Sequence, residues 1–297
     1  MRIGVIGFCT APGIAFAVKQ IMGDADVRGF EMAVVQREKR DEEALRYLAE
    51  CDVVLSHAVP SEYGRLSSDS MKGSFAGKFL LLPHIAFTGF HPDIAYLWGA
   101  DKKAIITRFG PYNSRIVAAS YALGLAEPAA LAFFRQEVFQ TLGYFEEYAK
   151  AKAFALRQYM IKGKSIAELF SRWERRGVFM HSFNHPKSHV LFDIASEALK
   201  VGNVIDKAPP LELVQSDHLS GSVIWPVYPP LAAALNLSGG SYFFKSFGST
   251  HGGTGEVPLF GLGEFVECCY ADYRKSGALT SDTTGLEKTK EALRRFV

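Results

Sequence analysis

The chain has 297 residues, of which 48% are hydrophobic and 13% aromatic, enough to build the core of one large domain or of two. The formal net charge is +2 and the charged residues are interspersed, with no basic tail or stripe, which argues against DNA or RNA as partners. The four cysteines form no CxxC pair, and the chain shows no signal peptide and no membrane-spanning stretch, so we expect a protein of the reducing cytoplasm without membrane insertion.

The first part of the chain, residues 1–112, alternates short apolar runs with helix-like segments. The runs that predict strands are residues 3–6, 31–35, 52–55 and 78–82. Residues 42–50 carry apolar side chains at helical spacing and lead straight into the third of these runs. The sequence therefore predicts an α/β fold in which a parallel sheet is flanked by helices.

Cys9 follows the first predicted strand, in a turn that leads into a second apolar stretch, residues 14–21. Ligands bind at the carboxyl ends of strands in open α/β sheets, and the start of a helix adds partial positive charge and free N–H groups. These conditions lower the pKa of a cysteine and make it a nucleophile. Gly7 permits backbone angles that a side chain would resist. The alternative is that Cys9 is a small buried hydrophobic residue.

Two histidines follow other predicted strands, His57 after residues 52–55 and His84 after residues 78–82. Because the carboxyl ends of parallel strands meet at one edge of the sheet, we expect both to lie at the same edge as Cys9. His57 is then placed to donate a hydrogen bond to an oxyanion or to an acceptor. The backbone N–H groups of Cys9 and Thr10, at the start of a helix, are the natural donors to an oxyanion.

The second part, residues 113–297, is predicted to be mainly helical, either completing the same domain or forming a closely packed second lobe. Residues 137–159 predict a single long amphipathic helix, and residues 188–201 predict another. Residues 206–230 are rich in proline and residues 239–263 in glycine, and both stretches are predicted to be loops.

His185 is the preferred candidate for a general base, since Asn184 and Pro186 hold it at the opening of the helix at residues 188–201. The alternative is that Asn184 caps this helix and His185 only packs. His84 and His91 are the other candidates, although the loop that holds His91 looks structural, with a helix-capping aspartate two residues later.

A metal site is not expected. His181, His185 and His189 recur every four residues, which on one helix would align three imidazoles. Pro186 would break that helix, so the three histidines do not share a face.

Several stretches, taken in order, resemble the WcbI-like family of capsular polysaccharide acetyltransferases. They are VIGFCTAPG, VVLSHAVPSEY, LLPHIAFTGFHPD, YNSRIVAASYALGL, FMHSFNHPKSHVLFDIA, VYPPLAAAL and LGEFVECCYADY. The resemblance implies an α/β, three-layer fold related to the SGNH hydrolases, with a cysteine where those enzymes have serine, and transfer of acetyl from acetyl-CoA to a sugar hydroxyl. Phe8 and Thr10 stand where the family has Asn and Gln, and His57 stands where a Gln is expected.

Acyl transfer needs a nucleophile, a base, donors to the oxyanion and an anchor for the phosphates of CoA. The catalytic candidates are Cys9, His57, Asn184 and His185. The residues expected to bind CoA are Gly7, Thr10, His84, Arg108, Arg115 and Lys187. Residues 246–250 are a candidate phosphate loop, and His251 beside them a candidate lid residue. The partners expected are CoA and a saccharide acceptor; the sequence does not indicate the oligomeric state.

Two other functions fit the same residues. In an esterase or deacetylase of the same fold, water takes the acetyl group. The other alternative is a non-catalytic sugar- or nucleotide-binding protein. Such a protein does not need the Asn and Gln that the family has beside its cysteine and that Phe8 and Thr10 replace here.

Overall fold

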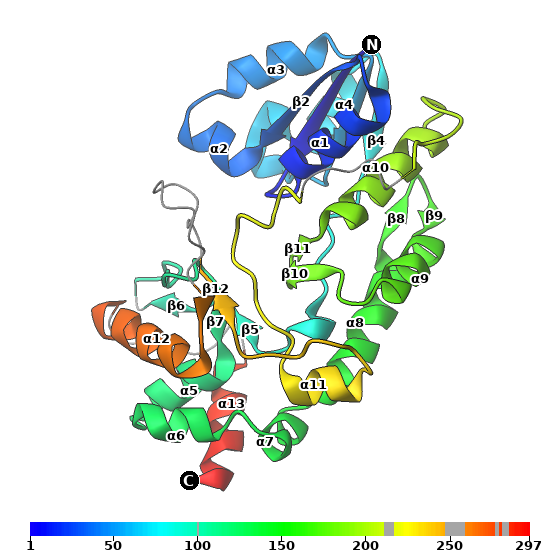
Figure 1. The fold of residues 1–297 in the computed structure, drawn as a ribbon. Coiled ribbons are helices and arrows are strands. Elements are labelled where there is room, and N and C mark those ends of the chain that lie inside the picture. The colour runs from blue at the N-terminus through cyan, green and yellow to red at the C-terminus, as the bar shows by residue number, and fades with distance from the viewer. Residues whose placement is uncertain (100, 211–216, 247–258, 277–278, 281–284) are drawn as a thin grey trace. The chain divides into compact units, whose positions relative to one another are not determined.

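The computed structural model describes the chain except residues 100, 211–216, 247–258, 277–278 and 281–284 (Figure 1). The chain divides into two compact units. Unit 1 comprises Met1–Ala86, Ala153–Met180 and Asn184–Leu219, and unit 2 comprises Phe87–Lys152, His181–Phe183 and Ser220–Val297. Two segments from the second part of the sequence thus belong to the same unit as Cys9.

Unit 1 is built on a four-stranded parallel sheet in the order β2-β1-β3-β4. Its strands are β1 (Arg2–Gly7), β2 (Asp26–Glu31), β3 (Val53–Ser56) and β4 (Lys78–Leu81). The register pairs Gly7 with Glu31 and Ile6 with Ser56, so the carboxyl ends of the strands lie level at one edge. The predicted parallel sheet with flanking helices is confirmed.

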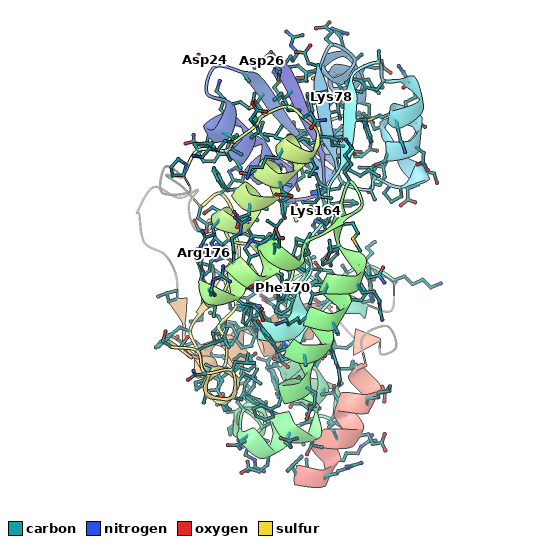
Figure 2. The ribbon with its side chains drawn as sticks, turned by 90° about the vertical axis from the view of Figure 1, so that its right-hand side faces the viewer. Asp24, Asp26, Lys78, Lys164, Phe170 and Arg176 are labelled. Atoms are coloured by element: carbon teal, nitrogen blue, oxygen red, sulfur yellow. The ribbon has the colours of Figure 1, made fainter. Side chains whose placement is uncertain are left out.

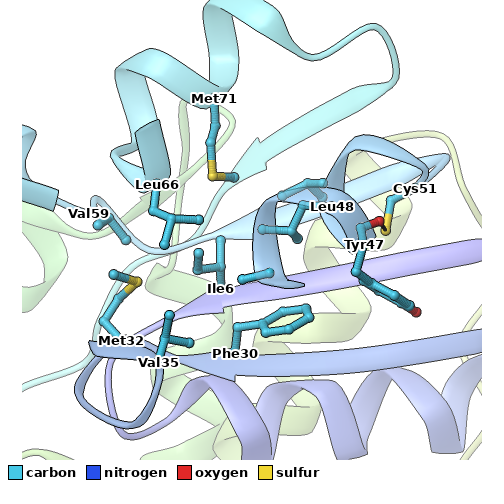
Figure 3. Close-up of a cluster of buried hydrophobic side chains, with 12 residues drawn as sticks. Ile6, Phe30, Met32, Val35, Tyr47, Leu48, Cys51, Val59, Leu66 and Met71 are labelled. Carbon is cyan, nitrogen blue, oxygen red and sulfur yellow. Dashed lines mark hydrogen bonds between the residues drawn. The ribbon is translucent and has the colours of Figure 1, made fainter. Parts of the chain in front are cut away.

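Helices cover both faces of this sheet. They are α1 (Ala11–Met22), α2 (Met32–Arg37), α3 (Asp41–Ala49), α4 (Ser68–Ser74) and α10 (Ser188–Val201), while α9 (Ala167–Arg175) of the same unit packs against α10. Gly29 of β2 faces Ala15 of α1, and the next residue, Phe30, points to the opposite face, as successive strand residues must. There Phe30 joins a core cluster with Ile6 and with side chains of α2, α3 and α4 (Figure 3). On the other face α10 packs against α1, where Leu191 lies close to Gly13.

The second strand is not where the sequence predicts it. Residues 31–35 were expected to be a strand, but helix α2 begins at Met32 and the strand is Asp26–Glu31. β2 lies at the edge of the sheet and five of its six residues are at least partly exposed, so its sequence, DVRGFE, lacks an apolar run. Met32 and Val35, one helical turn apart, are the residues of α2 that are buried.

The predicted long helix at residues 137–159 is also wrong. It consists of α7 (Gln136–Thr141) and α8 (Tyr144–Gln158). Gly143 between them has a φ of 73°, a left-handed conformation that ends the first helix. The helix predicted at residues 188–201 is confirmed as α10 with the same bounds.

Apart from α12 (Leu262–Ser276), a helix of 15 residues, the remaining elements are short. They include α5 (Arg115–Ala122), α6 (Glu127–Ala132), α11 (Pro229–Ala234) and α13 (Leu286–Leu293). Two-residue strands form the pairs β5 (Ile94–Ala95) with β7 (Asn113–Ser114), β6 (Trp98–Gly99) with β14 (Leu279–Thr280), β8 (Met160–Ile161) with β9 (Lys164–Ser165) and β12 (Phe244–Lys245) with β13 (Leu259–Phe260). Two further short strands are β10 (Met180–Ser182) and β11 (His185–Pro186). The 3-10 turns are η1 (Ser61–Leu66), η2 (Thr88–Phe90) and η4 (Arg294–Phe296). Among the described helices, none is both long and apolar enough to cross a membrane.

A buried carboxylate organises unit 2. Asp93 is 0% exposed and accepts hydrogen bonds from the hydroxyls of Tyr144 and Tyr228, both at 2.7 Å, and from the backbone N–H of Ile116 at 3.1 Å. It therefore caps the start of α5 and joins it to α8 and to the residue before α11. His91, two residues earlier, is also buried, which supports the structural interpretation of this loop.

Candidate functional site

The residues that follow β1, β3 and β4 lie together at the carboxyl edge of the sheet, as the sequence predicts. The Thr10 hydroxyl is 3.3 Å from Nε2 of His57 and 3.5 Å from Nδ1 of His84. The two imidazole rings lie edge to face with centroids 5.2 Å apart. Topology alone accounts for this meeting, because parallel strands in register end at the same level.

Gly7 makes room for His57. A Cβ atom at Gly7 would lie 2.1 Å from Nδ1 of His57, which no side chain could tolerate. The close approach lets the backbone N–H of Phe8 donate a hydrogen bond of 3.1 Å to that nitrogen. The sequence interpretation assigned Gly7 to unusual backbone angles, but its φ is not positive; the requirement is for space.

The Phe8 side chain completes a cluster of three rings. It stacks on His57 with centroids 5.9 Å apart and an interplanar angle of 7°, and it meets the edge of His84 at 5.3 Å. An asparagine at this position would not form these contacts. The structural role of Phe8 was missed because one aromatic residue beside a cysteine carries no periodic signal.

The Cys9 thiol is not acidic, which corrects the expectation from its place at the start of a helix. Burial, and after it the carboxylate of Glu31, raises the pKa of Cys9 to about 11. The backbone N–H groups of Cys9 and Thr10 face the sulfur and act in the opposite direction, but they do not offset burial. At pH 7 the Cys9 side chain is therefore a thiol and not a thiolate.

Glu31 is a site residue that the sequence did not indicate. It ends β2, directly beside the end of β1, and is half-buried, which raises its own pKa. Arg37 and His218 oppose that shift through their charges. Because the second strand was predicted to begin at this residue, rather than to end there, its side chain was not placed at the functional edge.

Both histidines of the cluster are held neutral. Burial, followed by the proximity of His84, lowers the pKa of His57 to about 3. Burial also lowers the pKa of His84. A neutral imidazole carries one N–H, so each ring has one donor and one acceptor nitrogen at physiological pH.

His185 is buried, with 6% of its surface exposed, and it belongs to unit 1 together with Cys9. It does not open α10: His185 and Pro186 form β11, and the helix begins at Ser188 after Lys187. Asn184 therefore does not cap that helix. The backbone N–H of Ser188 instead donates to the carboxylate of Asp217, at 3.3 Å.

The basic residues expected to bind CoA fall in different units. Lys187 belongs to unit 1, where burial lowers its pKa and the nearby Asp217 opposes the shift. Arg108 and Arg115 belong to unit 2. Arg108 lies 3.9 Å from the carboxylate of Asp272, and the backbone N–H of Arg115 donates to the carbonyl of Asp93. Of the candidate phosphate loop at residues 246–250, only residue 246 is described, and residue 251 also lies outside the described residues.

The histidines considered for a metal do not share a helix: His181 lies in β10, His185 in β11 and His189 in α10. The predicted break at Pro186 is thereby confirmed. No group of three or more histidine, cysteine or acidic side chains in the described part of the chain is arranged to hold a metal ion.

A surface groove of about 910 Å³ lies along α9 and α10, away from the predicted residues. Its lining includes Lys164, labelled in Figure 2, together with Arg172, Arg175 and Lys200. Lys164 is paired with Glu197 at 2.7 Å, so part of this positive charge is neutralised within the groove. None of the candidate catalytic or CoA-binding residues lines it.

Comparison with known proteins bears on the fold and the family of this chain. A solved structure of WcbI, described as a novel polysaccharide biosynthesis enzyme in its native form without a disulfide bond between coenzyme A and one of its cysteines, has a similar fold. The similarity covers 99% of this chain and 98% of that chain, with 16% sequence identity and a TM-score of 0.68. A search of the curated proteins found no match. The family described as polysaccharide biosynthesis enzyme WcbI matches residues 2–204, a span that contains the whole parallel sheet and Cys9, and the chain therefore belongs to the WcbI family of polysaccharide biosynthesis enzymes.

Proposed function

We propose that this protein is a CoA-dependent O-acetyltransferase that transfers acetyl from acetyl-CoA to a hydroxyl of a polysaccharide or sugar precursor, with Cys9 as the nucleophile. The observation that carries the proposal is the placement of Cys9 at the carboxyl end of β1, with two backbone N–H groups facing its sulfur. The WcbI structure, described as lacking a disulfide bond between CoA and one of its cysteines, supports the choice of acetyl-CoA as the acetyl donor.

In the first step the Cys9 sulfur attacks the carbonyl carbon of acetyl-CoA. The thiol proton passes to a base, the bond from carbon to the CoA sulfur breaks, and CoA leaves as a thiol after taking a proton. This exchanges one thioester for another and is nearly thermoneutral. In the second step the sugar hydroxyl attacks the acetyl-enzyme, its proton goes to the base, and Cys9 is released as a thiol.

Because the pKa of Cys9 is about 11, the base has to remove the thiol proton as the attack proceeds. His57 is poorly suited to this task, since its Nδ1 already accepts a hydrogen bond from Phe8 and its pKa is about 3. His185 is the proposed base. Asn184 is proposed to orient it, and Lys187, Arg108 and Arg115 to contact the phosphates of CoA.

The test is intact-mass and peptide mass spectrometry of the protein after incubation with acetyl-CoA. Wild type is expected to gain one acetyl group on Cys9, and Cys9→Ser is expected to lose that thioester adduct. Cys268→Ser is the matched control, because Cys268 is also a partly exposed free thiol and should leave the adduct unchanged. His185→Gln should slow acetylation.

Other results would change the assignment. Hydrolysis of a chromogenic acetate ester at a rate unaffected by CoA, and lost in Cys9→Ser, would favour an esterase. Binding of CoA or sugar without adduct or turnover, equal in wild type and Cys9→Ser, would favour a non-catalytic binding protein.

A further inference from the structure

The hydroxyl of Thr10 is engaged in an unusual way for its position. Thr10 is the N-cap residue of α1, where a threonine hydroxyl ordinarily accepts a hydrogen bond from the first turn of the helix. Here the side chain makes no capping hydrogen bond. It is 1% exposed, and its oxygen lies between Nε2 of His57 and Nδ1 of His84. We call the hydrogen-bonded set Phe8, His57, Thr10 and His84 the Thr10 relay.

The directions of the first two hydrogen bonds in the Thr10 relay follow from its first member, and the third is assigned from the proton that the Thr10 hydroxyl still has to donate. The backbone N–H of Phe8 can only donate, so Nδ1 of His57 accepts and the proton of this neutral ring is on Nε2. That N–H donates to the Thr10 oxygen, at 3.3 Å. The Thr10 hydroxyl has one proton, and the nitrogen in reach to accept it is Nδ1 of His84, at 3.5 Å.

His84 is the end of the relay. With Nδ1 accepting from Thr10, a neutral His84 carries its proton on Nε2. Nε2 makes no hydrogen bond to the part of the chain that the structure describes, and the His84 side chain is only partly buried. An N–H donor is thus presented at the same sheet edge as Cys9, whose neighbour in the chain is Thr10.

We propose that the Thr10 relay fixes His84 in the tautomer with the proton on Nε2, and that His84 donates this hydrogen bond to the carbonyl oxygen of the acetyl group. This rests on the proposed function. In this tautomer His84 cannot serve as a base for Cys9 through Nε2. It stabilises the oxyanion that forms when the sulfur attacks, together with the backbone N–H groups of Cys9 and Thr10. Thr10 and His57 are positioning residues.

The first test is nuclear magnetic resonance of nitrogen-15-labelled wild-type protein at neutral pH, with correlations from the ring carbon protons to the ring nitrogens and His84→Asn for assignment. The expected result is a protonated Nε2 and an accepting Nδ1. A His84 protonated on Nδ1, with a bare Nε2, is the form that a base would need and would overturn the proposal. This measurement needs no variant of the relay and no activity.

The second test compares Thr10→Val, which keeps the shape of the side chain but removes the hydroxyl, with Thr10→Ser, which restores it. Thr10→Val should shift the Nδ1 resonance of His84 and, at saturating acetyl-CoA, slow acetylation of Cys9 by on the order of tenfold or more. Thr10→Ser should return both toward wild type. Thr289→Val is the control, since that hydroxyl is also buried but donates to the carbonyl of Gly285, the N-cap residue of its own helix.

Equal acetylation rates in wild type and Thr10→Val would contradict the donor role of His84. An absent acetyl adduct in wild-type protein would instead refute the proposed function, and with it the donor role. The nitrogen-15 resonances of His84 decide the tautomer without any acetylation. Failure of the tautomer assignment and failure of the proposed function can therefore be told apart.

Discussion

Gly7→Ala tests the close approach on which the site depends. The added Cβ would lie 2.1 Å from Nδ1 and 2.6 Å from Cγ of His57. The ring cannot swing away freely, because it is 1% exposed and packed between Phe8 and His84. Overpacking of this kind costs about 1–3 kcal/mol. Separating Phe8 N–H from His57 costs roughly 1–3 kcal/mol more. The lower conformational entropy of alanine in the unfolded chain offsets about 0.5–1 kcal/mol.

We therefore expect Gly7→Ala to lower the free energy of unfolding of unit 1 by about 3 kcal/mol. The measurement is urea unfolding followed by hydrogen–deuterium exchange of peptides from β1 and β3, because these peptides report on unit 1 alone. Gly73→Ala is the matched control. Gly73 lies in α4, and nothing is within 4 Å of a Cβ atom placed there. That substitution should raise stability by about 0.5 kcal/mol. A Gly7→Ala protein within about 0.5 kcal/mol of wild type would show that His57 does not lie against Gly7.

Three further substitutions test the electrostatics. Glu31→Gln should lower the pKa of Cys9 from about 11 and speed alkylation of Cys9 by iodoacetamide at fixed pH. Glu62→Gln, on an exposed turn, is the control and should change neither. Equal alkylation rates for the two variants would contradict the role of Glu31. His57→Gln should reduce the loss of stability in acid. The pKa of His57 is about 3 in the folded protein, below the ordinary value of 6.5, so the unfolded chain binds a proton first as the pH falls. The free energy of unfolding of wild type therefore decreases by up to about 1.4 kcal/mol per pH unit as the pH falls from 6.5 towards 3. Unfolding free energies at about pH 6 and pH 4 should thus differ less in the variant, and identical slopes would refute the assignment. Asp93→Asn should destabilise unit 2 by about 2 kcal/mol, because an amide cannot accept hydrogen bonds from two tyrosine hydroxyls and a backbone N–H as a carboxylate does. Hydrogen–deuterium exchange of peptides from α5 measures this loss of stability. Exchange as slow as in wild type would contradict the role of Asp93.

Local patterns were sufficient for much of this fold. The apolar runs of β1, β3 and β4, the helical spacing in α3 and the bounds of α10 are properties of neighbouring residues, and each is found in the structure where the sequence predicts it, within a residue or two. Parallel pairing then brings the residues after β1, β3 and β4 to one edge, so Cys9, His57 and His84 could be grouped before any distance was known.

Other features depend on which segments pack together. β2 was misplaced because an edge strand needs little apolar sequence, and the long helix was overextended because its break depends on the conformation of one residue, Gly143. His185 was expected at a helix start and lies in a strand.

The chemistry of the site also depends on which segments pack together. The raised pKa of Cys9 comes from burial and from Glu31, which is 22 positions away in the sequence but paired with the neighbouring end of β1. The Thr10 hydroxyl turns from its own helix to two imidazoles that are 47 and 74 positions away. Local sequence is enough to tell which residue types reach the edge of the sheet. Their protonation and the directions of their hydrogen bonds come from the tertiary structure, because both depend on the desolvation and charge supplied by distant segments.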